Sequence, residues 1–135
     1  MEAIDDAESR YEAGLRMRRE VLGKDHVERS LAAATDFSRP MQDLVTEYCW
    51  GTVWTRPHLD LPTRSLLNLV MLTALNRGHE LAVHVRGAVR NGCTEDQIRE
   101  ALIQSAIYCG VPAALEAFRI ADRVLAEMRS AGSDS

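Results

Sequence analysis

Cysteines are scarce in this sequence, and their spacing excludes several kinds of site. The 135 residues include only three of them, Cys49, Cys93 and Cys109, which lie far apart and form no C-x-x-C pair. An odd number without a pairing motif argues against a disulfide framework, a zinc site and a thioredoxin-like redox centre. We therefore expect three reduced cysteines, mostly buried.

Several other signals are missing. No uncharged apolar stretch is long enough to span a membrane, and the acidic N-terminus lacks the apolar core of a signal peptide, so we expect a cytoplasmic protein without a membrane partner. The net charge of −4 and the lack of a Lys/Arg block argue against nucleic acid as a partner. Neither G-x-G-x-x-G nor a P-loop occurs, and Ser65 has no G-x-S-x-G context. Nucleotide cofactors and a serine hydrolase therefore have no support.

The composition, with 46% hydrophobic and 27% charged residues, is that of a soluble globular protein. Every periodic segment has helical spacing, and none shows the sustained alternation of a strand. We predict an all-α fold of six or seven helices. We assign it to a single domain over residues 1–135, with a core of about residues 10–128 and a frayed tail over residues 129–135.

Glycine, proline and capping residues predict the helix boundaries. The expected helices cover about residues 3–22, 38–54, 61–76, 79–91, 95–109 and 112–128, with a partly helical link over residues 24–37. Thr94 and Gln97 have the spacing of a capping box. In the first helix, Tyr11, Leu15, Arg18 and Leu22 recur at intervals of three and four. The segment RSLLNLVMLTALN is apolar on nearly every side, which predicts central burial or a subunit interface.

His79, Glu80 and His84 stand within six residues of a chain that has only four histidines. The zinc-protease motif H-E-x-x-H needs histidines four apart, whereas these are five apart and turned by about 140° on a helix, so no metal is expected. Arg77, Glu80 and His84 share a face if the helix continues through Gly78. A partly buried glutamate beside a histidine suits acid–base chemistry, although the spacing alone fits a surface i, i+4 pair better.

A second cluster lies between Trp50 and Ser65, where both tryptophans accompany Arg56, His58 and Arg64. Arg56 is expected in a loop beside Trp54, where a guanidinium could receive a carboxylate. The alternative is that Trp54 anchors a helix end and Arg56 is solvated.

Three segments together are similar to the 4-carboxymuconolactone decarboxylase family: RYEAGLRMRREVLGKDHVERS, EYCWGTVWTRPHLDLPTRSLLNLVMLTALNRGHELAVHVRGAVRNGCTEDQIREAL and YCGVPAALEAF. The resemblance spans about Arg10 to Phe118 and implies the helical bundle of the alkylhydroperoxidase D-like type. Related peroxidases carry a C-x-x-C before a histidine. Here Arg77 and Glu80 stand in place of those cysteines and His84 matches the histidine, so thiol chemistry is not expected.

The resemblance implies decarboxylation of 4-carboxymuconolactone to β-ketoadipate enol-lactone in protocatechuate breakdown, without a metal or cofactor. It implies His84 as the proton donor, oriented by Glu80. The substrate-binding residues that it implies are an anchor at Arg56 or Arg64, an apolar wall at Trp54, a further donor at His26 or His79, and Arg77. Family members form rings, so a homo-oligomer is expected, a hexamer built as a trimer of dimers. The alternatives are a decarboxylase or isomerase acting on another lactone or keto acid, and a non-catalytic oligomeric module that binds an acid.

Overall fold

The structure, a computed structural model, describes residues 8–133. Within this range the chain forms seven α-helices and one π-helix and no strand, which confirms the all-α prediction. The chain divides into two compact units, Met1–Leu61 and Pro62–Ser135, and each is described by itself. The assignment of residues 1–135 to a single domain stays a prediction.

The first unit begins with α1 (Arg10–Leu22) and α2 (Lys24–Ala32). The Ser9 hydroxyl accepts a hydrogen bond from the Glu12 N–H at 3.1 Å and caps α1. Gly23 has a φ of 91°, which only glycine adopts readily, and ends α1 as predicted. The expected start near residue 3 lies outside the described residues, and helix α2 confirms the partly helical link.

The predicted helix over residues 38–54 has the right extent, but it consists of two types of helix. It starts as α3 (Arg39–Leu44), with Pro40 in its first turn, and continues as a nine-residue π-helix, η1 (Val45–Val53). Hydrophobic periodicity does not distinguish this hydrogen-bonding pattern from an α-helix. π-Helical turns frequently occur at functional sites.

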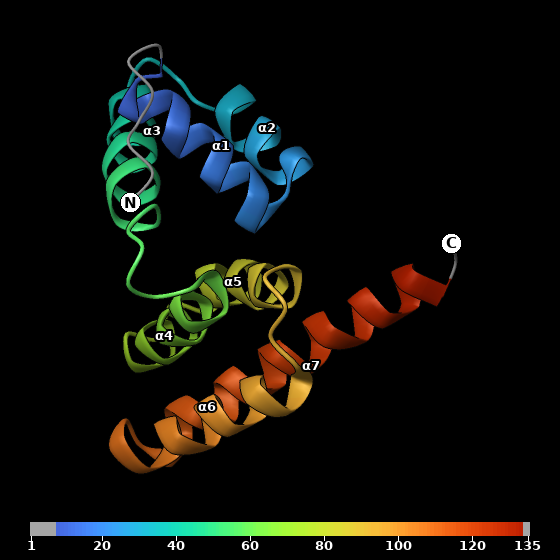
Figure 1. The fold of residues 1–135 in the computed structure, drawn as a ribbon. Coiled ribbons are helices and arrows are strands. Elements are labelled where there is room, and N and C mark those ends of the chain that lie inside the picture. The colour runs from blue at the N-terminus through green and yellow to red at the C-terminus, as the bar shows by residue number, and fades with distance from the viewer. Residues whose placement is uncertain (1–7, 134–135) are drawn as a thin grey trace. The chain divides into compact units, whose positions relative to one another are not determined.

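Helix α1 lies along η1 at very short range (Figure 1). A Cβ atom added at Gly14 would lie 1.9 Å from the carbonyl oxygen of Thr46. One added at Gly51 would lie 2.2 Å from the carbonyl oxygen of Arg10. The two backbones therefore approach to a distance that only glycine permits.

The second unit contains α4 (Leu61–Ala74) from its second residue onward, together with α5 (Gly78–Arg90), α6 (Glu95–Tyr108) and α7 (Val111–Ser133). Its core joins all four helices and includes Leu69, Leu81, Val85, Ile98, Leu102 and Val124, each buried. The predicted capping box at the start of α6 is confirmed. The Thr94 hydroxyl accepts from the Gln97 N–H at 3.0 Å, and the Gln97 side chain accepts from the Thr94 N–H at 2.9 Å.

The end of α7 differs from the sequence prediction. The helix continues to Ser133 instead of stopping near Met128, so the predicted helix end is wrong. The predicted fraying of residues 129–133 stays a prediction. Arg129 forms an ion pair with Glu95 at 2.6 Å, which ties the last turns to the start of α6. The rest of the predicted tail, residues 134–135, lies outside the described residues.

Helix α4 is less buried than its apolar sequence suggests. Only Ser65, Leu69 and Thr73 are buried along it, whereas Leu67 and Met71 are exposed. Of the two predicted explanations, central burial is therefore wrong for this chain, and a subunit interface stays a prediction together with the homo-oligomer. Within the described range, no helix has both the length and the apolar character needed to cross a bilayer. The cytoplasmic location also stays a prediction.

Candidate functional site

In the second unit, His84 of α5 meets Asn68 of α4. The side-chain nitrogen of Asn68 lies 3.4 Å from Nδ1 of His84, which is partly buried. With the amide nitrogen donating to Nδ1, a neutral ring carries its proton on Nε2. If the amide turns over, its oxygen accepts from the Nδ1–H of an imidazolium ring. Asn68 can therefore hold the ring in both charge states.

The hydrophobic pattern positions this pair at the edge of the core. Leu81 and Val85 of α5 are buried, and His84 adjoins that stripe. Asn68 adjoins Leu69, the buried leucine of α4, in the same way. Sequence reasoning singled out His84 but missed Asn68. The sequence feature that could have indicated Asn68 is that it is a polar amide within the apolar segment LLNLVML.

Glu80 lies one turn before His84 on α5 and is exposed. It occupies the first turn of the helix, where the helix dipole favours a carboxylate. Within residues 8–133 it makes no hydrogen bond or ion pair, whereas the His84 ring contacts Asn68. The orienting role of Glu80 stays a prediction.

The expected common face of Arg77, Glu80 and His84 is wrong. Helix α5 begins at Gly78, and Arg77 precedes it with φ −98° and ψ 73°, outside helical geometry. The physical reason is the chain reversal after α4, where Asn76 has a φ of 58°. Arg77 instead lines a hollow of about 100 Å³ together with Leu72 and Ile120. His79, the second residue of α5, is exposed.

Arg64 is partly buried and lies four residues before Asn68 on α4. Residues four apart share a helix face. The side of α4 that reaches His84 therefore also carries a guanidinium, which can bind a carboxylate through two parallel hydrogen bonds.

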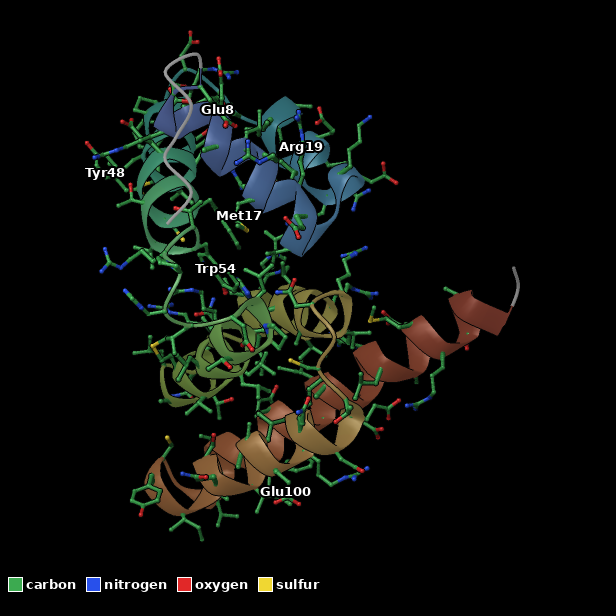
Figure 2. All side chains as sticks on the ribbon, viewed as in Figure 1. Glu8, Met17, Arg19, Tyr48, Trp54 and Glu100 are labelled. Carbon is green, nitrogen blue, oxygen red and sulfur yellow. The ribbon has the colours of Figure 1, made fainter. Side chains whose placement is uncertain are left out.

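In the first unit, Trp54 follows η1 directly and is buried. It stacks on Trp50, with ring centroids 4.8 Å apart and planes inclined by 26°. Figure 2 shows Trp54 at the end of the helical segment that carries Tyr48. The stacked pair forms the kind of rigid apolar surface expected of a pocket wall. Arg56 is exposed in the turn that follows, and His26 is half-buried in the first turn of α2.

A further residue of the first unit was not among the predicted site residues. Arg18 of α1 is only 6% exposed, and its Nη1 donates to the Thr46 hydroxyl at 3.1 Å. Burial lowers the pKa of Arg18, while the nearby Cys49 and Tyr11 raise it by a smaller amount. The sequence feature that could have indicated its burial is the position of Arg18 among the regularly spaced apolar residues of α1.

Cys49 is exposed as a residue, but its thiol is crowded by protein atoms. This desolvation raises the pKa of the Cys49 thiol, against the opposing effects of Arg18 and of a hydrogen bond from Trp54. The thiol therefore stays protonated at neutral pH. In the part of the chain that the structure describes, no group of three or more His, Cys, Asp or Glu side chains is placed to hold a metal ion.

Comparison with known proteins identifies the family. Residues 39–123 match the carboxymuconolactone decarboxylase family. The chain is 44% identical over 122 residues to a nitrosuccinic acid decarboxylase of Metarhizium robertsii, which covers 90% of this chain and 85% of the relative. It is 40% identical over 121 residues to a 4-carboxymuconolactone decarboxylase of Acinetobacter baylyi, which covers 90% of each. The chain therefore belongs to the carboxymuconolactone decarboxylase family.

Proposed function

We propose that this chain is a decarboxylase of small dicarboxylic acids and that 4-carboxymuconolactone is its substrate. The observation that carries this proposal is the His84–Asn68 pair, in which the amide holds Nδ1 of a titratable ring that can deliver a proton. The 40% identity to a 4-carboxymuconolactone decarboxylase supports the choice of substrate.

The reaction places few demands on the protein. Loss of CO₂ from the ring carbon of the lactone leaves an electron pair, which moves through the ring double bond into the lactone carbonyl. The resulting dienolate is protonated at the carbon next to that carbonyl. The lactone acts as its own electron acceptor, so the chemistry itself requires neither a metal nor a cofactor. The protein must bind the carboxylates, stabilise the negative oxygen and supply the proton.

In this mechanism the imidazolium of His84 donates its Nε2 proton to carbon. The ring that remains keeps its Nδ1–H, which the amide oxygen of Asn68 can accept. Arg64, on the Asn68 face of α4, binds a carboxylate of the substrate. The remaining proposed roles follow the family resemblance: Glu80 assists His84, Arg56 is an alternative anchor, Trp54 forms an apolar wall, and His26, His79 and Arg77 are further candidate donors.

Nitrosuccinic acid is the second candidate substrate, because the chain is 44% identical to an enzyme named for its decarboxylation. Loss of the carboxylate beside the nitro group leaves an electron pair that the nitro group accepts. Protonation at carbon then completes the reaction. Both candidates therefore require a bound carboxylate and a proton donor, and they differ in the group that accepts the electrons.

Offering both acids to the purified chain, after dialysis against a chelator, tests this proposal. We expect CO₂ release and an ultraviolet change with 4-carboxymuconolactone and little reaction with nitrosuccinic acid. The reverse preference would make nitrosuccinic acid the substrate. If the folded protein acted on neither, a different lactone or keto acid, or a non-catalytic acid-binding role, would replace the proposal.

Replacing Asn68 by aspartate is expected to raise the pKa of His84, because a carboxylate beside Nδ1 stabilises the imidazolium. A general acid loses activity as the pH rises through its pKa. The alkaline limb of the kcat–pH profile should therefore move to higher pH, by about one unit. Asn76→Asp introduces the same charge on an exposed loop residue and should leave the profile in place. An unshifted limb in Asn68→Asp would show that His84 is not the titrating acid.

A further inference from the structure

Arg18 carries a buried positive charge that no carboxylate balances within residues 8–133. Its Nη1 bonds the Thr46 hydroxyl, its buried Nε has no hydrogen-bond partner, and it forms no ion pair. Arg19, the next residue, is partly exposed and pairs with Glu28 at 2.6 Å. Figure 2 shows Arg19 on α1. Two adjacent arginines therefore differ in whether an acidic group neutralises them.

Among residues 8–133, the groups around Arg18 do not supply the missing charge. Its ionisable neighbours in this range are the thiol of Cys49 and the hydroxyl of Tyr11, and neither is a carboxylate. The Cys49 thiol is protonated at neutral pH for the reason given above. Burying a charge without a counter-ion is unfavourable, and an apolar residue in its place is often neutral or stabilising. Stability alone therefore does not explain an arginine at this position.

The local geometry holds the Arg18 guanidinium between α1 and η1. The close approach of α1 and η1 at Gly14 and Gly51 brings Arg18, one turn after Gly14, against the π-helix. Cys49 of η1 links Arg18 to the stacked tryptophans, because Trp54 hydrogen-bonds to it. A planar guanidinium presents its N–H donors in a fork that matches a carboxylate, and the Nε–H of Arg18 has no hydrogen-bond partner.

We propose that Arg18 binds the carboxylate of a small organic acid within the first unit, with its Nε–H as a donor. The proposal rests on the proposed function for the identity of the acid and assigns a binding residue that neither the sequence nor the family resemblance indicated. Succinate, an unreactive dicarboxylate, is a suitable probe because its binding can be measured without turnover. The test is therefore independent of whether either candidate substrate reacts.

The alkylation rate of Cys49 reports occupancy of this site. A carboxylate bound to Arg18 offsets its positive charge and further raises the pKa of the Cys49 thiol. We expect saturating succinate to slow the iodoacetamide reaction of Cys49, followed by mass spectrometry, by about fivefold or more. Cys109, in the second unit, serves as the internal control and should keep its rate. The Arg18→Met variant should lose the succinate effect, and Arg19→Met should retain it.

Thermal unfolding separates binding from a structural role. We expect Arg18→Met to keep or raise the Tm and to lose the increase in Tm that succinate produces in the wild type. Arg18→Lys keeps the positive charge but lacks the paired N–H donors of a guanidinium, so it should weaken succinate binding about tenfold. A lower Tm in Arg18→Met with an unchanged succinate response would overturn the proposal. Equal protection by inorganic phosphate and succinate would also overturn it, because the site would then be a general anion site.

Discussion

Replacing His84 by alanine is expected to lower kcat for decarboxylation by about 10²- to 10⁴-fold, the usual contribution of a general acid. The second unit should stay folded, because His84 lies at the edge of the buried cluster and is not part of it. The measurement is the steady-state rate of CO₂ release, with circular dichroism and Tm as checks of the fold.

His58→Ala is the matched control, because His58 is an exposed histidine in the loop before α4. It should leave kcat unchanged. A His84→Ala variant with nearly full turnover would remove His84 as the acid. Glu80→Gln would then be the next variant to measure, since Glu80 is the other proton-carrying side chain on that turn of α5.

Replacing Gly14 by alanine is expected to reduce the free energy of unfolding of the first unit by about 3 kcal/mol or more. The new Cβ would lie 1.9 Å from the Thr46 carbonyl oxygen and 2.8 Å from the Gly51 nitrogen. Both are backbone atoms that cannot rotate away, so α1 and η1 must separate. Urea unfolding followed by tryptophan fluorescence measures this directly, because both tryptophans, Trp50 and Trp54, belong to the first unit.

Gly132→Ala provides the control in the same protein. A Cβ at Gly132 meets no atom within 4 Å, and alanine favours a helix over glycine by about 1 kcal/mol. Because Gly132 lies in the second unit, this variant should leave the tryptophan-detected urea midpoint of the first unit at the wild-type value. If Gly14→Ala also unfolded at the wild-type midpoint, α1 and η1 would not be this close in solution. The hydrogen bond from Arg18 to Thr46 would then not form, because it requires this close approach.

The helices were largely predictable because their ends depend on neighbouring residues. Gly23 and Gly92 adopt the positive φ that ends a helix, and Thr94 caps α6 through a residue three positions away. The errors in the predicted helix ends arose where contacts between residues distant in the sequence determine the end. An ion pair between Arg129 and Glu95 attaches the last turns of α7 to the start of α6. No pattern in the neighbouring sequence predicts this ion pair.

The site was predictable in part for the same reason. His84 and Glu80 stood out because their spacing along one helix can be read directly. Asn68 did not, because its contact with His84 joins two helices and depends on how α4 packs against α5. Arg18 looked like one arginine among several until its burial separated it from Arg19.

The sequence by itself determined the helical class, most helix ends, the family resemblance and the candidate acid. Each of these depends on residue types and on spacing along the chain. Only the tertiary structure decided that residues 45–53 form a π-helix, that Asn68 holds His84, and that Arg18 is buried without a carboxylate partner among residues 8–133. The physical reason is that burial and pairing between helices depend on which backbones approach closely. In the first unit that approach occurs at two glycines, Gly14 and Gly51, which lie far apart in the sequence.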